Sequence, residues 1–135
     1  MAYLLNDREL RAVAFLDAKY EAEFGGKPHS NPDLVYFLGD NPQWSVSWSA
    51  YSGRVPTFRT NDGFYWYPAF KRMMVARDKL SALCMPVCPF FCDQLGTPVL
   101  GIRDPKRASQ LAGNCMNFLN ITLVQFVALS CFARR

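Results

Sequence analysis

Three cysteines and one histidine are the side chains of this sequence with the most distinctive chemistry. Cys84, Cys88 and Cys92 follow one another at four-residue steps among prolines, and His29 is the single histidine. Structural zinc sites usually combine two closely spaced pairs of ligands, and the sequence offers no second pair to go with these cysteines. Small apolar thiols packed in a turn broken by prolines explain the spacing more simply. We therefore predict no metal and no other cofactor.

The same residues could instead form the active site of an enzyme with a cysteine nucleophile. It would need His29 within hydrogen-bond distance of one thiol, with a third group to orient the imidazole. His29 stands between Pro28 and Pro32, in a segment that indicates a loop. The sequence also lacks a glycine-rich phosphate loop, a G-x-S-x-G motif and an H-E-x-x-H motif. We predict no catalytic residue, and a small enzyme with a reactive cysteine is only the third hypothesis.

The segment 54–79 interleaves cationic and aromatic side chains. Surfaces that bind single-stranded nucleic acid use rings to stack bases and cations to neutralise phosphates. Strands are rich in aromatic residues and helix exteriors in charges, so an ordinary fold explains the same pattern. Nucleic-acid binding is therefore the alternative hypothesis, and the same side chains would suit an acidic protein partner. The candidate binding residues are Arg54, Arg59, Tyr65, Tyr67, Lys71, Arg72 and Lys79.

Length and composition limit the fold. The chain has 135 residues, enough for one hydrophobic core, and we expect a single domain over residues 1–135. Half of the residues are hydrophobic, which excludes a disordered chain. Residues 1–40 hold four basic and seven acidic side chains, whereas residues 41–135 hold eleven basic and four acidic ones. The basic part would suit a negatively charged partner.

The expected location follows from the start of the chain and from its cysteines. The first residues show no secretory signal, and five cysteines are an odd number for a disulfide framework. We expect an intracellular, cytoplasmic protein and leave membrane association open.

Hydrophobic periodicity places the expected elements. Apolar residues at three- and four-residue steps predict an amphipathic helix over residues 6–24, with Asn6 and Glu9 as a capping box and Gly25 as its stop. Alternation of large apolar residues with serine over residues 44–50 predicts a half-buried antiparallel strand. Further strands are expected at 33–38, 54–60, 64–67 and 98–102, a hairpin turn at 61–63 and a second amphipathic helix at 69–83.

The last thirty residues predict one long apolar helix. Asp104 and Pro105 form a helix start, and residues 115–132 carry no charge. A helix that is apolar nearly all round must be covered by lipid or by protein. Its length just suffices for a membrane span, but its amides are costly towards lipid, so we favour a buried core helix. These amides are Asn117, Asn120 and Gln125.

Together these elements predict an α+β fold. An antiparallel meander of four to five strands would pack on the long C-terminal helix, flanked by the N-terminal and middle amphipathic helices. The absence of catalytic motifs and the high apolar content favour a non-catalytic protein-binding module or accessory subunit. Its partner would be another protein or a second copy of the chain. One version of this hypothesis is a small phage-type effector that blocks the activity of its partner. Nucleic acid, or a membrane contacted through residues 115–132, remain the other partners considered.

Overall fold

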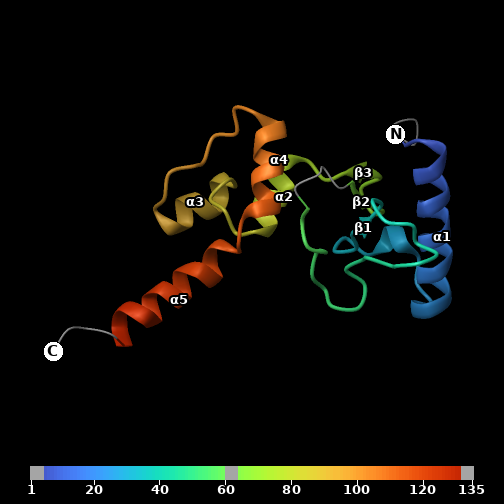
Figure 1. Cartoon of the computed structure of the whole chain (residues 1–135), viewed down its shortest axis with the longest axis horizontal. Helices are drawn as coiled ribbons and strands as arrows, with labels where there is room; N and C mark the ends of the chain where they lie inside the picture. The colour runs from blue at the N-terminus through green and yellow to red at the C-terminus, as the bar shows by residue number, and fades with distance from the viewer. Residues whose placement is uncertain (1–4, 60–63, 132–135) are drawn as a thin grey trace. The chain divides into compact units, whose positions relative to one another are not determined.

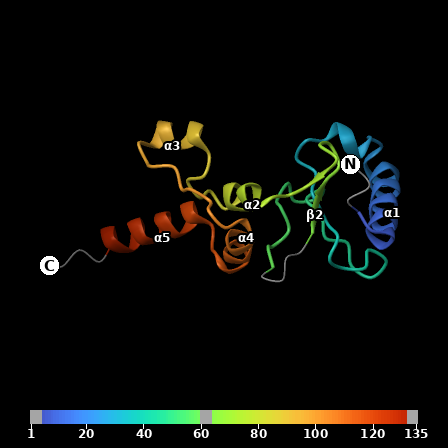
Figure 2. The same ribbon diagram turned by 90° about the horizontal axis from the view of Figure 1, so that it is seen from above.

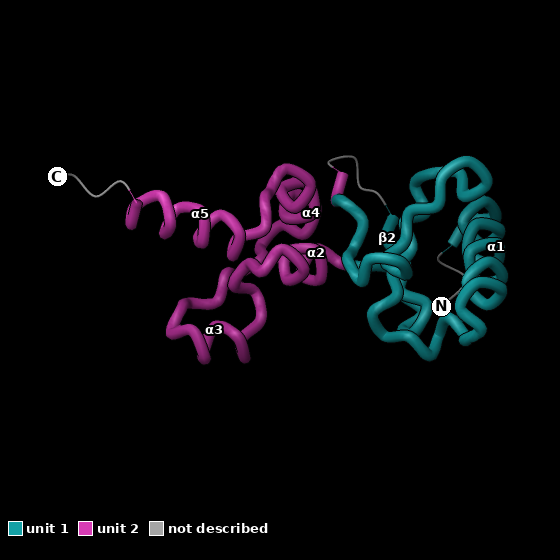
Figure 3. Tube along the Cα trace, turned by 90° about the horizontal axis from the view of Figure 1, so that it is seen from below, with its two compact units in different colours: residues 1–57, 62–74 teal, residues 58–61, 75–135 magenta. Residues whose placement is uncertain are grey.

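The computed structural model describes residues 5–59 and 64–131. Its internal contacts divide the chain into two compact units (Figure 3). Unit 1 comprises residues 1–57 and 62–74, and unit 2 comprises residues 58–61 and 75–135. The single domain over residues 1–135 stays a prediction.

Unit 1 begins with helix α1, Asp7–Phe24 (Figure 1). The Asn6 side chain accepts a hydrogen bond from the Glu9 backbone N–H at 2.9 Å, and the Glu9 carboxylate accepts one from the Asn6 N–H at 2.9 Å. This confirms the predicted capping box. The helix ends at Gly25, whose φ of 67° is readily adopted by glycine and whose N–H donates to the Glu21 carbonyl.

The sheet has three short antiparallel strands within the described residues. They are arranged in the order β1-β2-β3, with Tyr36 opposite Trp66 and Trp66 opposite Met73. The mixed α and β character agrees with the predicted class, but the predicted meander of four to five strands is wrong. The strands are β1 (Tyr36–Phe37), β2 (Tyr65–Tyr67) and β3 (Arg72–Met73).

Local contacts explain why the other expected strands do not form. Over residues 44–50 only an isolated bridge joins Trp48 to Tyr36. The Ser49 N–H donates to the Val35 carbonyl at 3.0 Å, but the Val35 N–H donates to the Ser49 hydroxyl at 2.9 Å and not to a backbone carbonyl, so the ladder does not extend. Residues 54–59 contain Pro56, which has no N–H to donate, and form no strand. Residues 98–102 also form none. The hairpin signal at 61–63 lies outside the described residues.

The middle helix is shorter than predicted. Residues 72–73 are β3, reached from β2 by a turn in which the Lys71 N–H donates to the Pro68 carbonyl and Lys71 adopts a φ of 49°. Residues 72–73, for which the apolar periodicity predicts a helix, therefore pair with β2. Helix α2 spans only Ala76–Ala82.

The core of unit 1 lies between α1 and the sheet (Figure 2). Helix α1 is therefore the helix that covers the sheet's apolar residues, and the predicted packing of the sheet on the C-terminal helix is wrong. The buried side chains of this core are Leu5, Ala12, Leu16, Tyr20, Leu34, Tyr36, Leu38, Trp48 and Trp66.

Unit 2 is helical in its described part. Helix α4 (Pro105–Asn114) packs against α2, and the buried Lys79 ammonium donates to the Ser109 hydroxyl at 2.6 Å between them. The helices that follow α2 are α3 (Pro89–Leu95), α4 (Pro105–Asn114) and α5 (Phe118–Cys131).

The C-terminal helix is broken. Asp104 caps α4 by accepting from the Arg107 N–H at 3.0 Å, as predicted, but α4 ends at Asn114 and the backbone of Cys115 is extended. Gly113 and Asn114 are weak helix formers, which explains a break inside the uncharged run. The axes of α4 and α5 differ in direction by 47°. One continuous helix from residue 104 onwards is thus a wrong prediction.

Candidate functional site

Helix α5 is the most unusual surface of unit 2, because an uncharged apolar helix lies exposed. None of its fourteen residues is buried. Leu123 is 63% exposed, Phe126 69% and Leu129 78%. Monomeric proteins rarely show contiguous apolar patches of this kind, and such patches commonly mark interaction sites. Within the described part of unit 2 no element buries a residue of α5, contrary to the predicted core helix.

The polar side chains of α5 divide into two kinds. The hydroxyls of Thr122 and Ser130 donate to the carbonyls of Phe118 and Phe126, four residues earlier, at 2.9 and 2.8 Å. They are therefore satisfied within the helix.

The amides behave differently from the hydroxyls. Asn117 accepts from the Asn120 N–H at 3.2 Å and so caps the start of α5. The side-chain amides of Asn120 and Gln125 have no hydrogen-bond partner among the described residues. Whatever covers α5 must therefore supply hydrogen-bonding groups to two amides that face different sides of the helix.

The first turn of α5 is attached to the end of α2 within unit 2. The Phe118 N–H donates to the Leu83 carbonyl at 2.9 Å, and the Asn117 side-chain amide donates to the Cys84 sulfur at 3.5 Å. Figure 1 shows α5 leaving the α2–α4 pair from this point. These two hydrogen bonds therefore fix the start of α5 to the end of α2.

Helix α3 adds exposed aromatic surface to the same unit. Phe90 is 66% exposed and Phe91 60%, and their rings meet edge to face with centroids 5.6 Å apart. Leu95, at the end of α3, is 68% exposed. Unit 2 therefore carries apolar side chains on two helices.

Among the described helices, none alone is long and apolar enough to cross a membrane. The bent pair α4 and α5 passes a test of length and composition together.

The predicted binding residues of unit 1 are partly brought together. Tyr67 and Arg72 face each other across β2 and β3, and the guanidinium carbon lies 5.2 Å from the centre of the tyrosine ring. Tyr65 is buried, with its hydroxyl donating to the Thr57 carbonyl at 2.7 Å. Lys71 lines a cavity on α1, and Arg54 is exposed in a loop.

The predicted residues of unit 2 are Arg59 and Lys79. Arg59 is exposed, whereas Lys79 is buried at the α2–α4 contact. The predicted residues thus fall in both units, and the hypothesis that they bind nucleic acid or an acidic partner stays a prediction.

The three closely spaced cysteines differ in environment. Cys84 is exposed, Cys88 precedes the first residue of α3, and Cys92 is buried within that helix. Across residues 5–59 and 64–131, no group of three or more histidine, cysteine, aspartate or glutamate side chains could hold a metal ion. His29 belongs to unit 1, in the short 3-10 helix η2, Pro28–Ser30.

A cavity of about 390 Å³ in unit 1 brings two carboxylates that the sequence pattern did not single out together with His29 and Lys71, which it did. Asp17 and Glu21 line it from α1, opposite His29 and Lys71, with Trp66 forming part of the wall. Burial raises the pKa of the Asp17 carboxyl, although the hydrogen bond from Tyr36 opposes that shift. Asp17 and Glu21 occupy what the periodicity marks as the wet side of a helix, so no local signal distinguishes them.

No family model, curated protein or solved structure matches the chain. The residues themselves are therefore the basis of the functional proposal.

Proposed function

We propose that the chain acts by macromolecular association, as a non-catalytic subunit whose α5 is buried among copies of the same chain. The observation that carries this proposal is that no residue is buried in a helix with no charge and no polar face. Burying large apolar side chains stabilises an assembly by roughly 1.5–3 kcal/mol each when burial is complete. Several such side chains on one helix supply a strong drive to associate.

The length of α5 favours a protein environment over a lipid one. Fourteen residues of α-helix are about 21 Å long, whereas a bilayer core is about 30 Å thick. The unpartnered amides of Asn120 and Gln125 argue in the same direction, because protein neighbours can offer donors and acceptors that lipid tails lack.

A bundle of copies suits the distribution of apolar residues around α5. A single partner helix covers one side only, whereas α5 is apolar on all sides. Several helices packed around one another cover most of that surface, as in helical bundles. The exposed aromatic side chains of Phe90 and Phe91 give each copy further apolar area for such contacts.

The test is the molar mass of the purified chain in buffer without detergent, by size-exclusion chromatography with light scattering. We expect an assembly of more than two copies. The double variant Leu123→Asp with Phe126→Asp should be monomeric, because it places charges in the buried bundle. The matched control is Leu111→Asp, which adds a charge at a side chain of α4 that is 52% exposed; it should retain the assembly.

Two outcomes would contradict the proposal. One is a monodisperse wild-type monomer throughout a concentration series. The other is a chain that dissolves only with detergent and then floats with phosphatidylcholine vesicles, which would show that lipid covers α5.

One observation supports nucleic-acid binding as a second candidate function. The Phe70 ring is 57% exposed, and the Arg72 guanidinium carbon lies 5.8 Å from its centre. An exposed ring beside a cation suits base stacking next to a phosphate. Fluorescence anisotropy with a labelled single-stranded oligonucleotide should then show binding that weakens steeply with salt and is lost in Phe70→Ala. Absence of binding at low salt would eliminate this candidate.

A further inference from the structure

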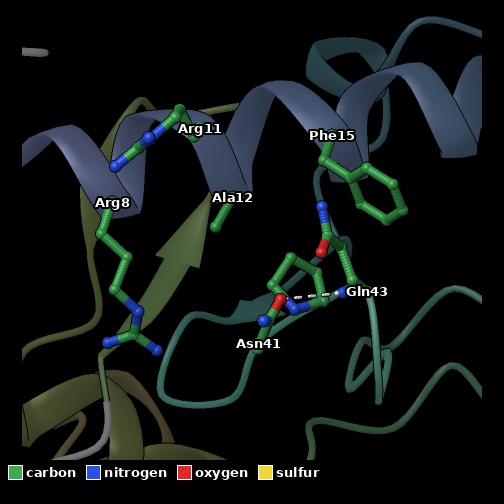
Figure 4. A pocket seen from close by; sticks show the side chains of 7 residues that line it. Arg8, Arg11, Ala12, Phe15, Asn41 and Gln43 are labelled. Atoms are coloured by element: carbon green, nitrogen blue, oxygen red, sulfur yellow. Dashed lines mark hydrogen bonds between the residues drawn. The ribbon is translucent and has the colours of Figure 1, made fainter.

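A second cavity in unit 1, of about 300 Å³, lies between α1 and the loop that follows β1. Figure 4 shows Arg8 and Phe15 extending from α1 on the side of the loop that carries Asn41 and Gln43, whereas the Arg11 side chain lies back along the helix. Ala12 and Pro42 complete the lining. The charged side chains that line this cavity are both arginines.

Helical geometry explains how α1 forms one wall. The positions Arg8, Arg11, Ala12 and Phe15 are separated by three, one and three residues, so they lie along one face of the helix. The small Ala12 leaves room between the arginines and the phenyl ring. The wall therefore offers positive charge at one end and an aromatic ring at the other.

Both guanidinium groups are held in place by backbone carbonyls. Arg8 donates from one terminal nitrogen to the carbonyls of Gly39 at 3.0 Å and Leu38 at 3.4 Å. Arg11 donates from Nε to the Asp7 carbonyl at 3.1 Å. A guanidinium has five N–H donors, so each arginine retains several for a ligand. In the described part of the chain neither arginine is paired with a carboxylate.

The loop wall is also ordered by hydrogen bonds. The Asn41 side chain accepts from the Gln43 N–H at 3.1 Å, and the Asn41 carbonyl accepts from the Trp44 N–H at 3.0 Å. This turn holds the Gln43 side chain towards α1 (Figure 4), and Pro42 lines the cavity beside it. The site is thus formed before any ligand arrives, which lowers the entropic cost of binding.

We propose that this cavity binds a small aromatic anion, whose carboxylate or phosphate contacts Arg8 and Arg11 and whose ring packs against Phe15 and Pro42. The planar guanidinium fork matches the oxygens of either anionic group. Phe15 is 41% exposed, so its face is available to a ring in the cavity. A volume of about 300 Å³ lies at the small end of the range for ligand pockets, and it suits a single-ring compound.

The experiment is an NMR titration of the full-length chain with phenyl phosphate, benzoate and benzyl alcohol, each in a separate sample. We expect a saturable shift of the backbone amides at Asn41, Gln43 and Trp44 with at least one anion and none with the neutral alcohol. The anion that binds more tightly identifies the preferred group. Binding should weaken as salt is raised, because ions screen the exposed guanidinium groups.

Variants separate the two parts of the site. Arg11→Gln should weaken anion binding by about tenfold or more, since it removes a charged donor. Phe15→Ala should weaken phenyl phosphate but leave inorganic phosphate unchanged. The matched control is Arg107→Gln, which removes an exposed arginine from α4 and should change nothing. Each variant is compared by circular dichroism to show that α1 is intact.

The proposal is overturned if benzyl alcohol shifts the same amides as strongly as the anions. It is equally overturned if Arg11→Gln and Arg107→Gln have the same effect, or if no anion produces a saturable shift.

Discussion

The hydroxyl of Tyr36 donates to Asp17 Oδ1 at 2.9 Å, so a buried phenol of β1 is tied to a carboxylate of α1. Tyr36 has no exposed surface, and burial is the first cause of its raised pKa, followed by the Asp17 charge. Burial also raises the pKa of Asp17, and the hydrogen bond partly offsets that effect. This pair therefore couples the helix, the sheet and the pH dependence of unit 1.

Tyr36→Phe should destabilise unit 1. The change removes the hydroxyl and leaves a half-buried carboxylate without its donor, at a cost of about 1–2 kcal/mol. The measurement is urea unfolding followed by tryptophan fluorescence, which reports on unit 1 because Trp44, Trp48 and Trp66 all belong to it. The matched control is Tyr51→Phe, which removes a hydroxyl that donates to the Glu23 carboxylate from a ring that is 63% exposed. Equal losses in both variants would contradict the assigned role.

Asp17→Asn should change how stability depends on pH. Because the pKa of folded Asp17 is raised above its unfolded value, the folded state binds the extra proton in the interval between the two values. The contribution of this group to stability is thus complete below the unfolded pKa and is lost as pH rises through the folded one. Asparagine cannot titrate, so the stability of the variant relative to wild type should increase with pH across that interval. Stability is measured for wild type and variant from about pH 3 to about pH 7, where carboxyl groups titrate. Parallel curves for the two proteins would refute this prediction.

Gly25→Ala and Gly26→Ala should differ although the residues are neighbours. Gly25 ends α1 at a φ of 67°, where a side chain is strained, whereas Gly26 has no positive φ. A Cβ at either position has open space around it, so only the backbone distinguishes them. We expect Gly25→Ala to cost about 1 kcal/mol and Gly26→Ala to be neutral or slightly stabilising. Urea unfolding of both variants decides the matter, and an equal effect would exclude backbone strain as the cause.

Ser109→Ala should weaken the contact between α2 and α4. The Lys79 ammonium is buried and donates to the Ser109 hydroxyl at 2.6 Å, so the change removes an acceptor from a buried charge. The expected loss is about 1–3 kcal/mol. Hydrogen exchange at the amides of the two helices measures it, with Ser81→Ala, at an exposed position of α2, as control. Unchanged exchange in Ser109→Ala would show that this hydrogen bond contributes little.

Local signals explain which parts of the fold the sequence could predict. Helix α1 was predicted with its capping box and its glycine stop because Asn6, Glu9 and Gly25 act within a few residues of the helix. The sheet was not, since its two- and three-residue strands depend on distant partners such as Trp66 and Met73. The break after α4 had a local signal in Gly113 and Asn114, but the apolar run on either side outweighed it.

The candidate surfaces show the same limit. The sequence predicts that α5 is apolar. Its exposure could not be predicted, because it depends on which helix packs on the sheet. That helix is α1, and no residue of α5 is buried. Arg8 and Arg11 belong to the wet side of α1 by periodicity. They line a cavity only because the fold places the turn at residues 41–43 opposite them.

The hydrogen bond from the Phe118 N–H to the Leu83 carbonyl has a mechanical consequence. It connects the first turn of α5 to the end of α2. A force applied to α5 is therefore transmitted to α2 and then to the Lys79–Ser109 contact with α4. A chain in which that contact has come apart would present its C-terminal helix at a wandering angle. Under the proposed assembly through α5, loss of the Lys79–Ser109 contact would therefore weaken association as well as the fold of unit 2.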